Sequence, residues 1–219
     1  MGLPELLANY GPLYLTALLT TWRLTIVSFA LVMVFSVLVT VLRVCPFRPL
    51  RLFGDFYVQV FRNIPGAVLV LIVVYALPHL KLLLDYEPSV ILATVLLGTA
   101  FGSENFMSGI NTIGVGQIEA ARSLGLSFAQ ILRTIVIPQA LRSTVLPMTN
   151  LFIAVMLTTA LGSQVPMTPQ ELTGVVTYIN TRESAGIVTF FVSAAGYIAT
   201  ALVAGFVGNA IDKKVRVIR

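Results

Sequence analysis

Long apolar segments separated by short polar ones dominate this chain. We expect five membrane-spanning helices, because each segment is long enough to cross the ~30 Å hydrocarbon layer of a bilayer. Their expected ranges are 23–42, 55–77, 88–110, 143–161 and 187–211. The second is the least regular, since Asp55, Gln59 and Arg62 interrupt its first half and only 64–77 is continuously apolar. The pattern predicts an all-α integral membrane protein.

A polar segment at 116–142 separates the third and fourth predicted spans. We expect two short helices here, outside the bilayer. Gly125 favours a left-handed turn that ends the first helix, and Ser127 with Gln130 predicts a capping box that starts the second. The second helix, which Pro138 should end or bend, has an apolar face made of Phe128, Ile131, Leu132, Ile135 and Val136. That face needs a cover, either the protein's own membrane helices or a partner.

The basic residues predict how the helices are oriented. One side of the topology has Arg43, Arg48, Arg51, Arg122, Arg133, Arg142, Lys213, Lys214, Arg216 and Arg219. The opposite side has only Arg23, Lys81 and Arg182. The positive-inside rule therefore predicts an external N-terminus, a cytoplasmic C-terminus and a cytoplasmic 116–142 segment. We interpret the net charge of +5 as basic loops facing anionic membrane lipid and not as a nucleic-acid surface.

Composition excludes several kinds of site. With Cys45 and His79 as the single cysteine and histidine, neither a disulfide within the chain nor a Cys/His metal cage is possible. We expect no catalytic residue and no metal. The only lysines, Lys81, Lys213 and Lys214, are not set in a G-x-x-x-x-G-K-[ST] loop, so any ATP that drives transport must be hydrolysed on another chain.

Glu119-Ala120-Ala121, then Gly125, then the run 137–140 resembles the EAA loop of ABC importer permeases, and the segment 57–65, YVQVFRNIP, is similar to their polar amino acid branch. The resemblance implies one permease domain over 1–219 with the type I ABC importer fold, spanning the cell membrane several times. It implies that 116–142 couples to an ATPase subunit, itself a dimer, that binds ATP and Mg²⁺, while this chain has no cofactor. The implied coupling residues are Glu119, Ala120, Ala121, Arg122 and Gly125.

The resemblance also implies a second permease subunit and an external amino-acid-binding protein, with glutamate or glutamine as the type of substrate. Two positions depart from the family pattern. Many relatives have arginine where this chain has Met107, and lysine where it has Leu157. A cation is what a substrate carboxylate requires in a cavity of low dielectric constant, so we expect a non-identical partner permease that keeps those groups.

Four polar residues are candidates for the substrate pathway: Glu104, Asn150, Thr158 and Thr159. Glu104 should have a partner, and it either lines the pathway or acts as a structural hydrogen-bonding group. Asn150 should bridge helices or face a cavity, whereas the threonine hydroxyls could instead bond within their own helix. Pro138 and Pro147 are candidate hinges beside the coupling loop.

Small-residue pairs could bring helices close together, either within the chain or across a dimer. They are Gly98 with Gly102 and Ala201 with Gly205. Glu171 is expected on an acidic external rim that either meets a partner or is merely solvated, and the resemblance implies that Glu171 lies near the binding protein. Two other classes stay open at this stage: an ATP-independent channel or carrier, and an integral membrane enzyme. The channel leaves the capped helices at 116–142 unexplained, and the enzyme lacks a nucleophile with a base or paired acids at membrane depth.

Overall fold

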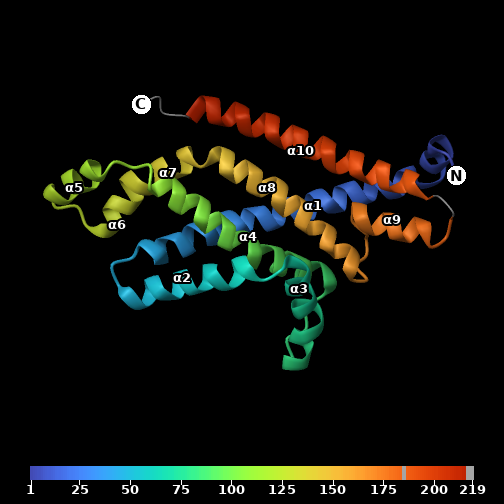
Figure 1. Cartoon of the computed structure of the whole chain (residues 1–219), viewed down its shortest axis with the longest axis horizontal. Helices are drawn as coiled ribbons and strands as arrows, with labels where there is room; N and C mark the ends of the chain where they lie inside the picture. Colours follow the sequence, from blue (N-terminus) through green and yellow to red (C-terminus); the bar gives the residue numbers. More distant parts are fainter. Residues whose placement is uncertain (184–185, 216–219) are drawn as a thin grey trace.

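The computed structural model describes residues 1–183 and 186–215, and all regular structure in that part of the chain is helical (Figure 1). Arg216 and Arg219, which contribute to the predicted orientation, lie outside the described residues. The elements are α1 Leu3–Val44, α2 Arg48–Asn63, α3 Gly66–Leu71, η1 Ile72–Ala76, η2 Leu77–Leu80, α4 Tyr86–Ile110, α5 Val115–Ser123, α6 Phe128–Ile131, η3 Leu132–Val136, α7 Ile137–Ser143, α8 Val145–Thr159, η4 Ala160–Gln164, α9 Leu172–Asn180 and α10 Ile187–Val215.

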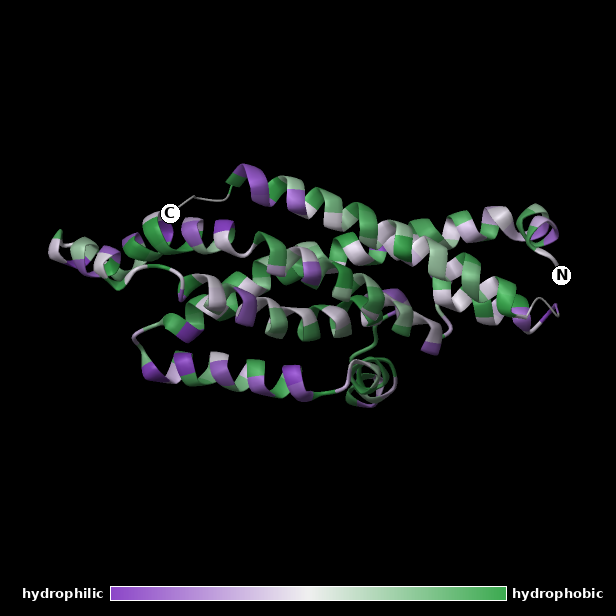
Figure 2. Cartoon of the chain, turned by 45° about the horizontal axis from the view of Figure 1, so that its top comes forward, coloured by the Kyte–Doolittle hydropathy of each residue, from purple (hydrophilic) through white to green (hydrophobic). Residues whose placement is uncertain are grey.

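Four continuous helical segments in the described chain can cross a membrane by length and composition, namely α1, α4, α8 with η4, and α10. These agree with the first, third, fourth and fifth predicted spans. In Figure 2 they appear mostly green, with polar residues gathered along α2 and towards the ends of the bundle. The all-α membrane architecture predicted from the sequence is confirmed.

The second predicted span, 55–77, is wrong as a single helix. The chain forms α2 up to Asn63, then turns by 103° into the segment 66–80, which projects from the bundle in Figure 1. The break follows from Pro65, because a proline ring disfavours helical geometry at the residue before it. Ile64 is accordingly extended, with φ −84° and ψ 128°.

α1 is far longer than the predicted 23–42. Its 42 residues begin at Leu3, so at ~1.5 Å per residue it is about 63 Å long, twice the thickness of a bilayer core. The polar residues that interrupt the hydropathy pattern are compatible with a helix, because the hydroxyls of Thr20, Thr21 and Thr25 bond to carbonyls four residues earlier. The first half of α1 packs against α9 through a buried cluster that includes Leu6, Tyr14 and Val175.

The centre of the bundle is the close packing of α4 against α1. A Cβ added at Gly98 would lie 2.7 Å from Val32 Cγ2, and one at Gly102 would lie 2.8 Å from Ser36 Cβ. The first predicted small-residue pair therefore acts within the chain. A Cβ at Gly205 would meet nothing within 4 Å, so the second pair makes no such approach in the described residues.

Candidate functional site

The predicted short helices form a projection at one end of the bundle (Figure 1), which we call the knob, residues 115–143. Its first turn is set by Gly125, whose φ of +77° is the left-handed conformation expected from the sequence. The amide of Leu126 bonds to the carbonyl of Ala121 and the amide of Gly125 to that of Arg122, the two bonds of a Schellman motif. Glycine is needed here because other residues are strained at positive φ.

The predicted capping box is confirmed. The Ser127 amide donates to Gln130 Oε1 at 2.8 Å, and the Gln130 amide donates to Ser127 Oγ at 3.4 Å. The Schellman turn and the capping box are only two residues apart. Together they fix the angle between α5 and α6 with local hydrogen bonds alone.

The inner face of the knob is covered by the protein's own helices. Ala121, Ile131 and Val136 are buried in a cluster that also contains Ile113 and Leu132. Val41 and Val44 from the end of α1 and Ile110 from the end of α4 pack against this cluster. One predicted member of the face differs, since Phe128 is 39% exposed. The knob is therefore anchored to the two central membrane helices.

The outer face of the knob is open. Of the predicted coupling residues, Glu119, Ala120, Arg122 and Gly125 are exposed, whereas Ala121 is buried and can contact only its own chain. In the described structure no ion pair joins Glu119 to Arg122, so both charges are free to meet another molecule. An apolar residue, Leu124, is 80% exposed beside them.

The two candidate hinge prolines lie in consecutive helices, Pro138 in α7 and Pro147 in α8. Pro138 does not end the helix, because a π-helical turn at η3 directly precedes it and the helix runs on to Ser143. The break comes at Thr144, with φ −105° and ψ 9°. Pro147 lies in the first turn of α8, where its ring would clash with the carbonyl of Ser143 in a continuous helix. The proline thus favours a break just after Ser143, and the break lies at Thr144, three residues before the proline.

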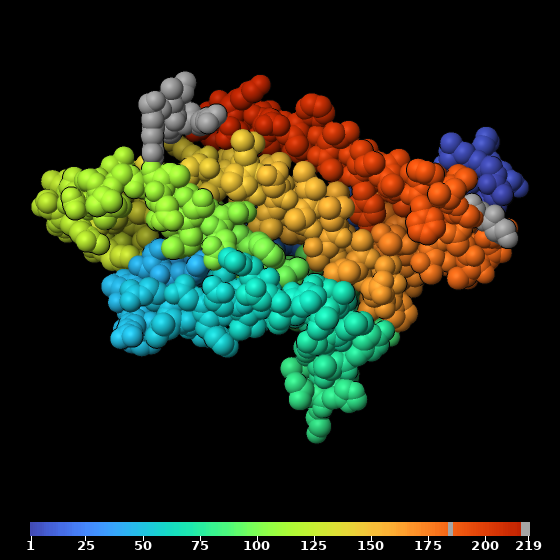
Figure 3. Space-filling view, viewed as in Figure 1, coloured from blue at the N-terminus to red at the C-terminus, as the bar shows by residue number. Residues whose placement is uncertain are grey.

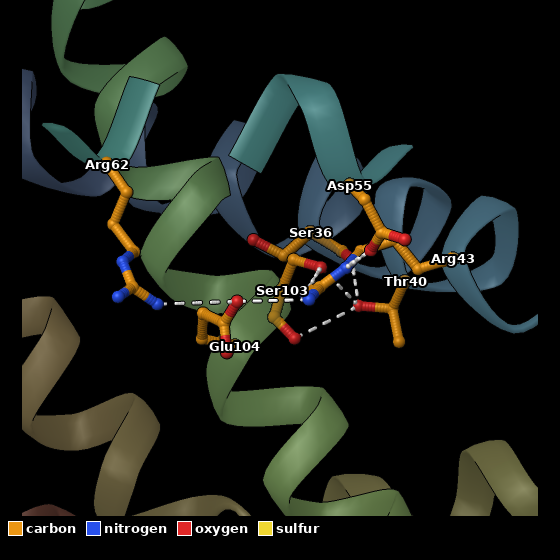
Figure 4. Close-up of polar contacts among 7 residues, drawn as sticks. All are labelled: Ser36, Thr40, Arg43, Asp55, Arg62, Ser103 and Glu104. Atoms are coloured by element: carbon orange, nitrogen blue, oxygen red, sulfur yellow. Dashed lines mark hydrogen bonds and ion pairs between the residues drawn. The ribbon is translucent and has the colours of Figure 1, made fainter. Parts of the chain in front are cut away.

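A polar network lies beside the knob at the same end of α4 (Figure 4). Arg43 of α1 is its centre: Nε is 2.9 Å from Asp55 Oδ1 of α2, and Nη2 is 3.0 Å from Glu104 Oε1 of α4. Nη1 donates to Ser103 Oγ at 3.1 Å. Arg62, at the end of α2, lies 3.5 Å from the same Glu104 oxygen. One guanidinium therefore connects three helices.

The network is partly buried, and its charges balance. The Arg43 side chain is only 11% exposed, compared with 48% for Asp55 and 33% for Glu104. A buried guanidinium requires several acceptors, and two carboxylates supply them. The prediction that Glu104 has a partner is confirmed. The sequence did not show which residue this partner is, because Arg43 appears there as one of several basic residues in a predicted loop. In the structure Arg43 lies two turns after Ser36, which is buried against α4, and this burial is not visible in the sequence.

The other predicted pathway residues do not join this network. Asn150 is exposed on α8 and has no hydrogen-bond partner within the described residues, so it does not bridge helices there, and the alternative that it faces a cavity stays a prediction. Asn105 makes such a bridge instead, donating to the Pro147 carbonyl at 3.2 Å. The hydroxyls of Thr158 and Thr159 bond to carbonyls of their own helix.

Glu171 is not on an exposed rim. Its side chain is fully buried and caps α9, accepting from the amides of Thr173 and Gly174 at 2.7 and 2.6 Å and from the Tyr197 hydroxyl at 2.7 Å. Burial raises the pKa of the Glu171 carboxyl above its usual value, and the bonds from Thr173, Tyr197 and Gly174 oppose that shift. The prediction that it belongs to an acidic surface is therefore wrong, and its role is structural.

Known proteins show to which family a chain with this arrangement belongs. Residues 33–217 match the family model described as the inner membrane component of binding-protein-dependent transport systems. The chain belongs to this family. The permease is thus a non-catalytic, multi-pass membrane subunit whose ATPase is a separate chain and which works with a binding protein. The membrane-enzyme and ATP-independent alternatives have no support.

Relatives of the permease are amino acid transporters. It is 36% identical over 168 residues to a glutamate transport system permease of Corynebacterium glutamicum, covering 71% of this chain and 74% of that protein. It is 31% identical over 153 residues to a probable glutamine ABC transporter permease of Bacillus subtilis, covering 70% of each. These relatives agree with the resemblance to the polar amino acid branch.

Solved structures confirm the type I importer fold. An amino acid ABC transporter crystallised with histidines superposes with a TM-score of 0.86 at 23% identity, covering 95% of the permease and 96% of that chain. An inward-facing methionine ABC transporter superposes with a TM-score of 0.81 at 21% identity, covering 99% and 100%. At these identities the likeness establishes the fold.

Proposed function

We propose that the permease forms one half of the membrane pathway of an importer for a glutamate- or glutamine-type amino acid. The names of the glutamate and glutamine relatives support this substrate class. The knob is cytoplasmic in this proposal, with the N-terminus outside, because the knob, the end of α1, the start of α2 and the end of α10 together hold most of the basic residues. Its outer face docks on an ATPase dimer that binds ATP and Mg²⁺.

The form of the knob is the observation that carries the docking proposal. Its inner face packs against α1 and α4, and the turn between α5 and α6 is fixed by Gly125 and by the capping box. Its outer face nevertheless presents Leu124, Glu119 and Arg122 to solvent. A rigid projection with an open mixed face transmits movement of a docked partner to the helices on which it rests.

A second, non-identical permease completes the pathway. Where relatives have cations, this chain has Met107 and Leu157, and Leu157 is 53% exposed on α8. The nearby cations Arg43 and Arg62 are both engaged with Glu104. A substrate carboxylate therefore finds its positive partner on the other permease subunit. Purification of the complex with one kind of permease chain, present twice, would overturn this part of the proposal.

Substitution of two equally exposed leucines, one in the knob and one outside it, tests whether the outer face of the knob docks on the ATPase. Leu124 in the knob and Leu83 in the loop before α4 are each 80% exposed, so aspartate at either position costs little folding stability. We expect Leu124→Asp to reduce the ATPase that co-purifies with the permease, while Leu83→Asp leaves it unchanged. Equal retention of the ATPase by both variants, with both inserted normally in the membrane, would refute docking at the knob.

The substrate class has its own test. The whole complex, reconstituted with its binding protein and ATP, should accumulate glutamate or glutamine in proteoliposomes. Uptake restricted to cationic amino acids would contradict the proposed substrate and would leave the docking proposal intact, because docking does not depend on what is carried.

A further inference from the structure

A large groove lies between α1, α8 and α10, and none of the residues of the Arg43 network lines it. It encloses a cavity of about 650 Å³. Figure 3 shows α10 lying along α8 at one edge of the molecule. The lining is dominated by apolar residues, such as Phe29, Met148, Phe152 and Val203. Helix α10 contacts α8 and α9 but has only three buried residues among those described, so much of one side of the helix borders the groove.

The few polar groups that line the groove are already bonded. Each of the four lining threonines donates to a backbone carbonyl four residues earlier, at 2.7–2.9 Å: Thr25, Thr144, Thr149 and Thr200. The indole nitrogen of Trp22 donates to Thr200 Oγ at 2.9 Å. No donor among these lining residues is left for a polar ligand. The groove therefore suits a hydrocarbon chain and not an amino acid.

The groove ends beside a group of basic residues. At its knob end it is lined by Leu141 of α7 and Ile211 of α10. Arg142 follows the first of these, and Lys213 with Lys214 follow the second, all three being exposed. Asp212 is the acidic residue on the same turn, so this end has an excess of positive charge. Exposed cations beside an apolar slot complement an anionic headgroup attached to an acyl chain.

We propose that this groove binds an anionic phospholipid, with an acyl chain between α1, α8 and α10 and the phosphate at the basic end. Between Gly196 and Ile211 the groove follows α10 for about 22 Å, at ~1.5 Å per residue. One leaflet of the hydrocarbon layer is about 15 Å deep, so the groove is long enough for a whole chain. The lipid fills the space that α10 leaves open and joins it to the bundle.

The single tryptophan of the chain allows a direct test, because Trp22 lines the groove. The complete complex is placed in phosphatidylcholine nanodiscs that contain a minor fraction of lipid brominated in its acyl chains. The bromine is carried either by phosphatidylglycerol or by phosphatidylcholine at the same fraction. Subtracting the signal of the Trp22→Phe complex removes fluorescence from other subunits. We expect brominated phosphatidylglycerol to quench Trp22 more strongly.

Two matched alanines on α10 locate the site. Ala204 lines the groove, whereas Ala201 does not. Ala204→Phe should abolish the extra quenching by phosphatidylglycerol, while Ala201→Phe should retain it. The double variant Lys213→Gln, Lys214→Gln should reduce the preference for phosphatidylglycerol by about five-fold for each lysine removed. This variant keeps the groove itself intact, so it tests the proposal even if the phenylalanine disturbs packing.

Equal quenching by the two brominated lipids in the unaltered complex would overturn the proposal. So would an extra quenching that survives both Ala204→Phe and loss of the two lysines. A helix of the second permease is the competing occupant of the groove. Disulfide trapping of Val203→Cys to a cysteine on that subunit, with no quenching difference between the lipids, would assign the groove to the subunit interface instead.

Discussion

Replacement of Arg43 by methionine is the sharpest test of the polar network. Methionine keeps the aliphatic bulk of the side chain but removes the guanidinium that is 2.9 Å from Asp55, 3.0 Å from Glu104 and 3.1 Å from Ser103 Oγ. Removing one member of a fully buried ion pair costs about 3–5 kcal/mol. Because both carboxylates here are partly exposed and regain water, we expect a loss of about 2–3 kcal/mol.

Arg62 supplies the matched control. It reaches Glu104 at 3.5 Å, has a side chain 40% exposed, and forms a single ion pair in the described structure. Arg62→Met should therefore cost less than about 1 kcal/mol. For a chain of this length the Arg43 variant should unfold about 4–12 °C lower, as measured by thermal unfolding of the detergent-solubilised complex.

A double-mutant cycle separates the Arg43–Glu104 contact from general damage. The loss in Arg43→Met together with Glu104→Gln should be smaller than the sum of the single losses by more than about 0.5 kcal/mol. Equal losses of stability in the two arginine variants, or a coupling energy of zero between Arg43 and Glu104, would show that Arg43 is not the centre of the network. Either result would refute the reasoning from burial.

Three further predictions concern packing, capping and pH. Gly102→Ala should cost about 1–3 kcal/mol by forcing α4 away from α1, whereas Gly205→Ala should not destabilise; thermal unfolding distinguishes them, and equal effects would contradict the close approach. Ser127→Ala should cost about 1 kcal/mol and increase amide exchange in the knob, while the exposed Ser123→Ala should not. Because the pKa of Glu171 is raised, its neutral form is favoured in the folded protein, so that stabilisation is complete below the unfolded-state pKa and is lost as pH rises through the folded value. The unfolding temperature of the unaltered protein minus that of Glu171→Gln should therefore increase as pH falls, and a constant difference would contradict the shift.

Local signals in the sequence were sufficient to predict the turn between the two short helices of the knob. The left-handed turn at Gly125 and the capping box of Ser127 and Gln130 depend on residues at most five apart, so the chain specifies them without help from the rest of the fold.

Helix breaks were harder to predict. Pro65 and Pro147 were visible, but hydropathy alone did not show that the chain would turn by 103° at one and break before the other.

Long-range contacts could not be predicted. Arg43 and Glu104 are 61 residues apart, and only the packing of α4 on α1 brings them together. Burial of Glu171 was missed for the same reason, since Tyr197, which donates to it, belongs to α10. A charged residue in a loop segment has the same appearance in the sequence whether it faces water or a neighbouring helix.

The unusual length of α1 has a mechanical consequence. Its first half packs on α9, and its last turns, at Val41 and Val44, support the knob. One long helix, which contains Pro12, therefore connects α9 with the knob, the part of the permease that we propose docks on the ATPase. If the part of α1 after Pro12 tilts as a unit by about 5° about its middle, its two ends move about 2 Å in opposite directions, since 13–44 spans about 48 Å at ~1.5 Å per residue. If the knob docks on the ATPase as we propose, movement there would reach α9, at the other end of the bundle, through this one helix.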